Sequence, residues 1–438
     1  MTSSKKAENV RDVIRYLHKF KNALLVIYLD DKTISSPLFS SHIRDIALLH
    51  QAGLKVVLIP GARRRIDEVL DNAKIKWTHH EGIRVTTSDA MPLIKMAAFD
   101  VSNTVMTSLA ANNITAVIGN WVRARGKGVL GGFDFGTAGE IDKLETEAIQ
   151  TVLNDGFIPI FPCIGWSAAG HPYNISSILL AKQVAMNLKA DKLFFMMFNE
   201  EINTENYTIP EGFSLSEGGN IPAMDLDEVE RFLEKNASAK GDIKNLMKAA
   251  QEACRAGVTR VHILDGSKDG VLPCEIFSGL GSGTMIYTGG YGKVRPMEQT
   301  DIPSVLAIMR PFVESGKLLS RSEEQIASAL EDYIVFELDG GVHACAALHF
   351  YEDGQAEIAA VAVDENYAHM GIGPKLIDNL IEQAGEGGAA SIFIMTTQTA
   401  DWFEKLGFEE DSIESLPAER RAMWTPERGS KVFRLKND

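Results

Sequence analysis

Residues Ala356–Ala384 have the sequence AEIAAVAVDENYAHMGIGPKLIDNLIEQA, and this stretch decides the fold of the last third of the chain. Its apolar beginning predicts a buried strand, and its end predicts a helix over Gly373–Ala384. Gly371 and Gly373 lie in the turn between them. Glycines let backbone amides approach a phosphate, and a helix N-terminus adds about half a positive charge there. The stretch therefore predicts a pyrophosphate site made of backbone groups.

The segments on both sides of this stretch extend it into a domain with a mixed sheet. A helix is expected over Ile302–Arg310, and Asp339-Gly340-Gly341 is a hairpin signal between two strands. A short helix is expected before the last strand. The predicted strands cover residues 333–338, 342–350, 356–363, 391–396 and 431–435.

The first 285 residues alternate β-branched apolar runs with helical patterns. The predicted strands cover residues 23–29, 55–59, 115–118, 157–161, 192–198 and 259–264, with helices between them, such as 41–52 and 179–188. This alternation predicts an α/β fold with an open, mostly parallel sheet and helices on both faces. Residues 200–222 are polar and are expected to form a hairpin or a surface excursion.

Glycines and a proline cluster in TGGYGKVRP, where the periodicity stops, so residues 288–296 are expected to link two domains. These domains would cover residues 1–287 and 297–438. Residues 8–20 predict an amphipathic helix. It would either dock on its own domain or, as an arm formed by residues 1–20, pack against another subunit.

Composition excludes several classes of protein. The chain has 438 residues, of which 45% are hydrophobic and 24% charged, as in ordinary globular proteins. A net charge of −15 argues against a general nucleic-acid binder. The apolar runs are far shorter than the roughly 20 residues of a membrane helix, and the N-terminus lacks a secretory signal. The four cysteines are scattered, which favours reduced thiols and a cytoplasmic location.

The block Tyr333–Leu435 resembles the GNAT family of acetyl-CoA-dependent N-acetyltransferases. The family's Q/R-x-x-G-x-G/A signature falls on residues 368–373, with Ala368 where Arg or Gln is usual. The resemblance implies that the preceding strand pairs with the pantetheine arm and that its amides polarise the thioester carbonyl. It places acetyl-CoA against Ala360, Val361, Ala362, Val363, His369, Met370, Gly371, Ile372 and Gly373.

Acylation of an amine by a thioester needs a base and an acid. Glu357 is the only carboxylate of its apolar strand, and desolvation there would make it a useful base. The alternative is a solvated strand end. Trp402–Phe408 resembles the GNAT block in which a tyrosine protonates the leaving thiolate, but this chain has Phe403. The acid is then the hydroxyl of Thr396 acting through water, or solvent itself.

The first 285 residues resemble the amino-acid kinase family, which includes acetylglutamate, carbamate and aspartate kinases. Those kinases hold ATP phosphates with a lysine near a Gly-Gly pair and with a second glycine-rich turn. Here Tyr28-Leu29-Asp30-Asp31 stands at the first place and Pro60-Gly61-Ala62-Arg63 at the second. Two carboxylates repel phosphate, and without the lysine no cation offsets the transition-state charge. Kinase activity is therefore not expected.

The two halves together resemble the two-domain bacterial N-acetylglutamate synthases. The resemblance implies acetyl transfer from acetyl-CoA to L-glutamate, the first step of arginine biosynthesis, with inhibition by L-arginine bound in the kinase-like domain. It places L-glutamate against Arg321, Arg420, Arg428 and Ser430. It places L-arginine against Lys192, Glu275, Gly281 and Gly283, although Glu275 could instead form only a local pair.

Members of that family assemble through the kinase-like domain, so a homo-oligomer is expected, with a hexamer favoured over a dimer. Two other functions stay open: a kinase acting on acetylglutamate, and an arginine sensor whose GNAT half has lost activity. His79-His80 lacks further ligand spacing, so no metal is expected. No nucleic-acid or membrane partner is expected either.

Overall fold

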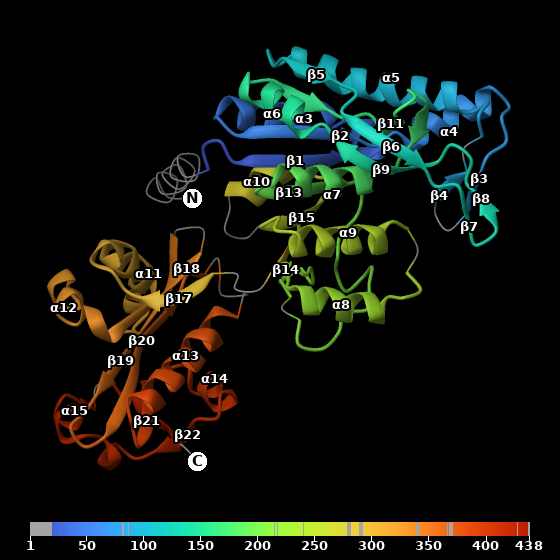
Figure 1. Ribbon diagram of the computed structural model, residues 1–438. Coiled ribbons are helices and arrows are strands. Elements are labelled where there is room, and N and C mark those ends of the chain that lie inside the picture. Colours follow the sequence, from blue (N-terminus) through green and yellow to red (C-terminus); the bar gives the residue numbers. More distant parts are fainter. Residues whose placement is uncertain are drawn as a thin grey trace. The chain divides into compact units, whose positions relative to one another are not determined.

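The computed structural model describes residues 20–80, 83–85, 87–213, 215–216, 218–239, 241–277, 282–288, 292–338, 341–365, 367, 371–426 and 428–436. The chain divides into two compact units, Met1–Gly289 and Gly290–Asp438 (Figure 1). Each unit has its own sheet and its own apolar clusters.

The N-terminal unit is built on an eight-stranded sheet with the order β14-β16-β15-β13-β1-β2-β10-β5. Its strands pair in parallel except for the antiparallel pair β15–β16. Their bounds are β1 Leu24–Leu29, β2 Lys55–Pro60, β5 Ala116–Ile118, β10 Ile158–Ile160, β13 Lys192–Met197, β14 Ala223–Met224, β15 Arg260–Asp265 and β16 Thr284–Tyr287. The predicted mostly parallel sheet is confirmed.

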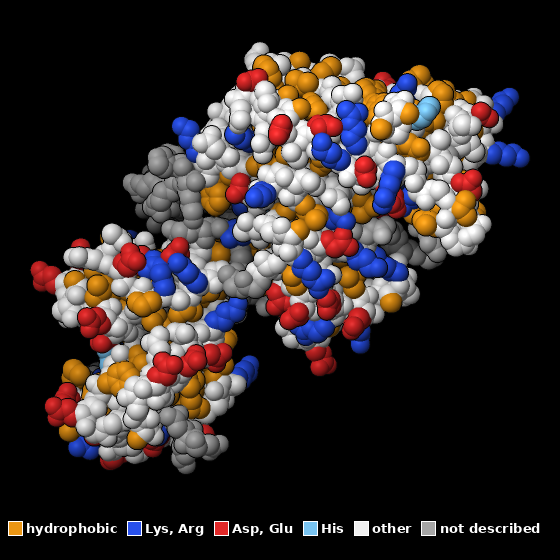
Figure 2. All heavy atoms as spheres, viewed as in Figure 1, with side chains coloured by type: hydrophobic (Ala, Val, Ile, Leu, Met, Phe, Trp, Pro, Cys, Tyr) orange, Lys and Arg blue, Asp and Glu red, His pale blue; other side chains and the backbone are white. Residues whose placement is uncertain are grey.

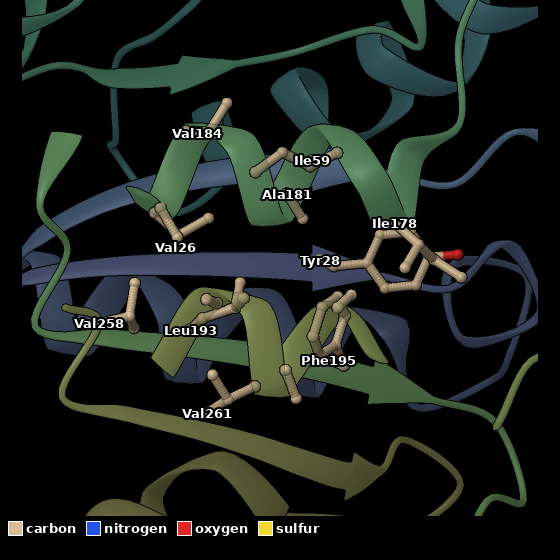
Figure 3. Packing of buried hydrophobic residues seen from close by; sticks show 14 of the residues in the cluster. Val26, Tyr28, Ile59, Ile178, Ala181, Val184, Leu193, Phe195, Val258 and Val261 are labelled. Carbon is tan, nitrogen blue, oxygen red and sulfur yellow. The ribbon is translucent and has the colours of Figure 1, made fainter. Parts of the chain in front are cut away.

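Helices cover both faces of this sheet, because its central strands are apolar on both sides. One face packs against α3 (Phe39–Gln51), α5 (Met91–Ala110) and α10 (Val271–Phe277). The other packs against α6 (Thr146–Asn154), α7 (Ser177–Leu188), α8 (Leu226–Lys235) and α9 (Ile243–Arg255). Figure 3 shows this second layer, in which Ala181 and Val184 of α7 lie over Val26 of β1.

Smaller elements surround the main sheet. A four-stranded sheet has the order β12-β11-β6-β9, with β6 Val122–Gly126, β9 Gly139–Leu144, β11 Ile164–Trp166 and β12 Pro172–Asn174. Two hairpins join β3 (Thr78–His80) to β4 (Ile83–Val85) and β7 (Val129–Leu130) to β8 (Phe133–Asp134). In the described part of residues 200–222, a β-bridge between Asn203 and Asn220 closes the base of the predicted excursion.

The C-terminal unit is built on a seven-stranded mixed sheet with the order β17-β18-β19-β20-β21-β23-β22. Its strands are β17 Lys293–Pro296, β18 Tyr333–Leu338, β19 Gly341–Phe350, β20 Gln355–Val363, β21 Ser391–Thr396, β22 Glu409–Asp411 and β23 Lys431–Lys436. Strand β17 pairs with β18, so the linker predicted over residues 288–296 is too long. The glycines in this segment mask the strand pattern of β17, which forms one edge of the sheet by pairing with β18.

Two layers of helices enclose this second sheet. On one face α11 (Ile302–Glu314) and α12 (Glu323–Ser328) pack over Tyr333, Cys345 and Ala362. On the other, α13 (Ile372–Glu386) and α14 (Ala400–Lys405) pack over Ile358 and Ile394. A short helix, α15 (Ala418–Ala422), lies between β22 and β23 in the sequence. The predicted GNAT-like mixed sheet is confirmed.

The visible surface carries charges of both signs. On the face seen in Figure 2, Lys and Arg side chains are interspersed with Asp and Glu side chains. Among the described residues, no helix is long and apolar enough to cross a membrane. The helical arm predicted over residues 8–20 lies outside the described residues, except for Phe20.

Candidate active site

Strands β20 and β21 diverge in the middle of the C-terminal sheet. Their parallel pairing covers Gln355–Ile358 on β20, whereas β20 itself continues to Val363. Beyond Ile358, the backbone groups on this side of β20 are not bonded to β21. An extended chain with its own amides, such as a pantetheine arm, can form backbone hydrogen bonds with an unpaired strand edge of this kind. The predicted acetyl-CoA residues Ala360, Val361, Ala362 and Val363 lie on this stretch.

A β-bulge at Ala360 changes which side chains face each layer. The pairs Cys345–Ala362 and Ala347–Ala359 leave one extra residue on β20, and Ala360 has a φ of +54°. A left-handed alanine costs roughly 1–2 kcal/mol, which the surrounding sheet must offset. Before the bulge Ile358 faces α13, and after it Val361 does. The bulge therefore places Ala360 on the same face as Glu357, with its carbonyl accepting from the Cys345 thiol.

The glycine turn stands at the start of α13. Gly371 has a φ of +64° and precedes the buried Ile372, which begins the helix. A Cβ at Gly373 would lie 3.0 Å from the Trp402 ring, so a glycine allows close packing of the helix start against α14. His369 and Met370, which were also assigned to acetyl-CoA, lie outside the described residues. In the described part of this loop, α13 begins at Ile372 directly after the left-handed Gly371.

The side chain of Glu357 is only 5% exposed, so the alternative of a solvated strand end is wrong. Its Oε2 accepts two hydrogen bonds, from the Tyr351 hydroxyl at 2.7 Å and from Nε of Arg420 at 2.7 Å. Burial, and next the negative charge of Glu357, raise the pKa of Tyr351, which therefore stays a neutral donor. The predicted base is thus a buried carboxylate held in place by one hydroxyl and one guanidinium.

The residues assigned to L-glutamate each contact another residue of the C-terminal unit. Arg420 pairs with Glu357, as described above. Nε of Arg428 donates to the Ser430 hydroxyl at 3.2 Å, so these two residues lie together. Nη1 of Arg321 donates to the Tyr333 hydroxyl at 2.5 Å. Nη2 of Arg428 also lies 3.4 Å from the carbonyl of Lys317, which links the segment before Arg321 to the loop after α15.

The predicted acid Thr396 ends β21, where β20 and β21 have already diverged. Its hydroxyl lies 2.7 Å from the hydroxyl of Thr399 and accepts from the Thr399 amide at 3.1 Å. In the pairing of β21 with β23, Thr396 stands opposite Lys431, the residue that follows Ser430. Phe403 is buried against Trp402 and serves the core.

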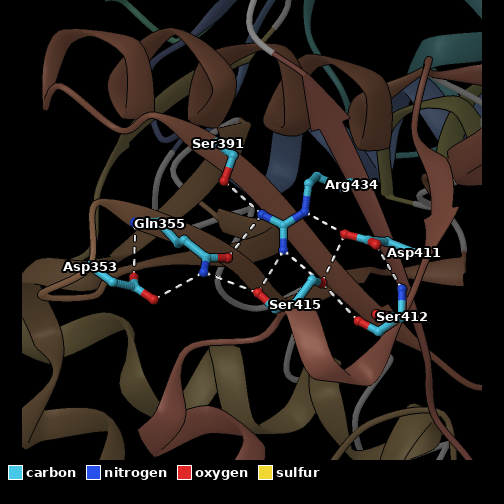
Figure 4. Close-up of polar contacts among 7 residues, drawn as sticks. All are labelled: Asp353, Gln355, Ser391, Asp411, Ser412, Ser415 and Arg434. Atoms are coloured by element: carbon cyan, nitrogen blue, oxygen red, sulfur yellow. Dashed lines mark hydrogen bonds and ion pairs between the residues drawn. The ribbon is translucent and has the colours of Figure 1, made fainter.

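A half-buried guanidinium network, which the sequence did not indicate, fixes the segment that leads to α15. Nε of Arg434 donates to Asp411 at 2.6 Å, and Nη1 donates to Gln355 at 2.8 Å and to Ser391 at 2.6 Å. Nη2 contacts both the carbonyl and the hydroxyl of Ser415 (Figure 4). Arg434 thereby ties the chain before α15, which carries Arg420, to the strands β20 and β21.

In the N-terminal unit, the helix end where a kinase would bind phosphate is already capped. The carboxylate of Asp31 accepts the backbone N–H of Arg64 in the first turn of α4 (Arg63–Asn72). Burial, and next the charge of Asp31, raise the pKa of Asp30 to about 6. A Cβ on Gly61 would lie 3.2 Å from the Asp31 amide, so the turn leaves little room. This geometry disfavours a bound phosphate, as the two aspartates predicted.

Glu275 lies in a buried polar cluster beside β13 and β15. Its Oε1 lies 2.6 Å from Nδ1 of His262, and its Oε2 accepts the amides of Ser282 at 2.6 Å and Gly283 at 3.0 Å. Burial opposes ionisation of Glu275, but the hydrogen bond from His262 and the two amides hold its pKa below the usual value. The described contacts of Glu275 are therefore local.

The other residues assigned to L-arginine lie near this cluster or outside the described residues. Lys192 is buried and stands opposite Arg260 in register, and Phe194, two residues later, stacks on His262. A Cβ on Gly283 would lie 2.3 Å from the carbonyl of Ile263, so only glycine fits there. Gly281 lies outside the described residues. Sequence reasoning missed Arg260 and His262, although both are polar residues in an apolar strand.

The histidine pair considered for metal binding has aromatic partners. His79 meets the Trp77 ring edge to face at 5.2 Å, and His80 stacks on Phe133 at 4.1 Å. Among the residues that the structure describes, no group of three or more His, Cys, Asp or Glu side chains could hold a metal ion.

Comparisons with known proteins match both units. Residues 26–265 match the amino acid kinase family and residues 303–408 match the acetyltransferase (GNAT) family. An amino-acid acetyltransferase of Actinobacillus pleuropneumoniae is 33% identical over 429 residues, covering 96% of both chains. That of Pasteurella multocida is 32% identical and covers 99% of this chain and 98% of its own.

A solved structure of N-acetylglutamate synthase from Neisseria gonorrhoeae with coenzyme A and L-arginine is also similar. It has a TM-score of 0.79 and 29% identity, and the match covers 98% of this chain and 99% of that chain. The same protein with coenzyme A and N-acetylglutamate has a TM-score of 0.60 at the same identity and coverage.

Proposed function

Because the chain belongs to the amino-acid acetyltransferase family and is an acyltransferase that uses acetyl-CoA, we propose that L-glutamate is the amino acid it acetylates. The product would be N-acetylglutamate, and the reaction would be the first step of arginine biosynthesis. Two findings support this acceptor: the N-acetylglutamate bound to the similar Neisseria enzyme, and the contacts that Arg321, Arg420 and Arg428 make within the C-terminal unit, with Arg420 on the candidate base.

The contact of Glu357 with Arg420 carries the proposal, because it joins the base to a residue of the acceptor pocket. The ammonium group of glutamate must lose a proton before it can attack a thioester. Glu357 takes that proton. Arg428, Ser430 and Arg321 hold the two carboxylates of the substrate, since guanidinium groups bind carboxylates through paired hydrogen bonds.

The diverging part of β20 would hold the thioester. Amides of Ala360–Val363 that are not bonded to β21 pair with the pantetheine arm and polarise the carbonyl oxygen as negative charge develops on it. The turn at Gly371 and Gly373 holds the pyrophosphate. When the tetrahedral intermediate collapses, its nitrogen releases the second ammonium proton. The thiolate takes a proton from the hydroxyl of Thr396 through water, and the proton released by the nitrogen restores that hydroxyl; alternatively, the thiolate takes its proton from solvent and the nitrogen gives its proton to solvent.

The N-terminal unit would serve as the regulatory domain. L-Arginine would bind beside Lys192 and Glu275, near the turn at Gly281 and Gly283, and lower activity. L-Arginine bound to the similar Neisseria enzyme supports this role. We further propose a homo-oligomer, with a hexamer favoured and residues 8–20 as an arm between subunits. Light scattering on a chain lacking residues 1–20 tests the arm, and an unchanged mass would remove it.

A thiol-release assay tests the proposed reaction. Acetyl-CoA and L-glutamate together should release free CoA, and mass spectrometry should detect N-acetylglutamate. D-Glutamate and L-alanine serve as acceptors that lack the correct geometry or the second carboxylate. Thiol release with another amino acid but not with L-glutamate would reassign the acceptor. Formation of ADP from ATP and acetylglutamate would restore the kinase alternative, against which the Asp31 contact argues.

A further inference from the structure

A histidine–aspartate pair lies directly across the sheet from Glu357. In the antiparallel pairing of β19 with β20, His349 stands opposite Glu357, and Nδ1 of His349 lies 2.7 Å from Oδ2 of Asp332. Directly opposed residues project to the same face, with Cβ atoms about 4.5–5.5 Å apart. Both side chains therefore stand on the face that carries Tyr351 and Arg420.

The two sides of this pair differ in their access to water. The side chain of Glu357 is 5% exposed, whereas those of His349 and Asp332 are 23% and 42% exposed. A buried base that takes a proton in every turnover must release it before the next one. The exposed fraction of the side chain therefore increases from Glu357, which receives the proton, to His349 and then to Asp332.

The groups that touch Glu357 directly cannot remove that proton. Arg420 is a permanent cation that has no lone pair to offer. Tyr351 donates its hydroxyl to Glu357, and burial, and next the charge of Glu357, raise the pKa of that hydroxyl. An imidazole is different, because it takes and gives protons near neutral pH. A carboxylate on Nδ1 keeps the hydrogen there and leaves the lone pair on Nε2.

From this geometry we propose that His349, oriented by Asp332, receives the substrate proton from Glu357 and passes it to solvent. The inference rests on the proposed function of Glu357 as the base. Glu357 takes a proton from the ammonium of the substrate and becomes a carboxylic acid. That acid gives the proton to Nε2 of His349, directly or through one water, and returns to a carboxylate. The imidazolium then loses a proton to bulk water and becomes neutral again, so no charge accumulates.

His349 acts through Glu357 and does not touch the substrate in this scheme, so its test needs a readout that a structural role would not change. Chemical rescue supplies one. We expect His349→Ala to lower kcat at saturating substrates by about a hundredfold, the low end of what a proton-transfer group contributes. Added imidazole should restore kcat several-fold, because the site is open to solvent. The KM values for both substrates should change less than kcat.

Two further variants and one control sharpen the outcome. His349→Gln keeps a donor to Asp332 and fills the space, so it should lose kcat without rescue by imidazole. Asp332→Asn should lower kcat less. Phe350→Ala is the matched control, since Phe350 is the next residue of β19, faces the other layer and is 53% exposed. It should keep kcat and show no response to imidazole.

The proposal is overturned if His349→Ala keeps kcat. It is also overturned if His349→Ala loses kcat with a lower melting temperature and without any rescue, or if His349→Gln keeps kcat. These outcomes are measured relative to the wild-type enzyme with the acceptor that it uses best. Failure of the proposed function would instead appear as absence of thiol release with L-glutamate in the wild-type enzyme.

Discussion

Nε of Arg420 donates to Oε2 of Glu357 at 2.7 Å, although 63 positions separate the two residues in the sequence. The contact joins β20 of the C-terminal sheet to α15, which lies between β22 and β23 in the sequence. A base and a substrate-binding cation therefore share one ion pair, so a change in either should affect both turnover and acceptor binding.

Replacing Glu357 tests the base. Glu357→Gln keeps the size of the side chain and can still accept from Tyr351, but it cannot take a proton. We expect kcat to fall by about 10²–10⁴-fold, the usual contribution of a general base, and the pH–rate profile to change. Steady-state thiol release over a range of pH measures both. An unaltered profile would leave the base unassigned.

Arg428 should contribute to acceptor binding rather than to acetyl-CoA binding. Arg428→Ala removes a charge-assisted hydrogen bond worth about 1.5–3 kcal/mol, so the KM for L-glutamate should rise about tenfold to a hundredfold. The KM for acetyl-CoA should rise less. Arg421→Ala is a matched control, because Arg421 is exposed and its guanidinium donates to the backbone carbonyl of Glu414. A larger effect on acetyl-CoA would contradict the assignment.

The network around Arg434 should position α15. Arg434→Lys keeps a positive charge but loses the fork that holds Gln355, Ser391 and Ser415 together. We expect unfolding of the C-terminal unit to become easier by about 2–3 kcal/mol and the KM for L-glutamate to increase, because Arg420 loses its support. Thermal unfolding and kinetics test the two effects separately. An increase in the acetyl-CoA KM alone would show that the network serves the other ligand.

The buried polar cluster around Glu275 should control the response to L-arginine. Glu275→Gln keeps an acceptor for the amides of Ser282 and Gly283 but removes the charge that a guanidinium or ammonium group would meet. Turnover without arginine should stay at the wild-type level, while the arginine concentration needed for half of its effect should rise at least about tenfold. An unchanged arginine response would limit Glu275 to its local pairing with His262.

Asp30 predicts a pH-dependent stability that does not depend on activity. The pKa of this carboxyl in the folded protein is about 6, because burial, and next Asp31, disfavour its charge. The folded state therefore binds more protons than the unfolded state between about pH 4 and pH 6, and its stability falls as pH rises through this window. Asp30→Asn removes that cost at pH 8 and has little effect at pH 4.

Urea unfolding at both pH values measures this difference. We expect Asp30→Asn to raise the free energy of unfolding at pH 8 by about 1–3 kcal/mol, with most of the gain absent at pH 4. Asp155→Asn, at an exposed helix end, serves as the control and should give no pH-dependent difference. An equal effect of Asp30→Asn at both pH values would show that its charge is not the cause.

The sequence by itself determined the order and type of the main elements and the nature of the key residues. Period-two and period-3.6 patterns decide which side chains are buried, so the strands at Lys55, Lys192 and Tyr333 and the helix after Gly371 follow from local sequence. Glu357 could be identified as a candidate because it is a carboxylate within an apolar strand. Strand β17 was not predicted, because glycines and a proline weaken the local pattern.

Only the tertiary structure decided how distant residues meet. Pairing of Glu357 with Arg420, and of His349 with Asp332, depends on strand register and on a helix brought back from later in the chain. The bulge at Ala360 and the divergence of β20 from β21 depend on how β20 pairs with β19 on one side and with β21 on the other. Such contacts gain free energy only after the sheet has formed, so no local pattern in the sequence encodes them.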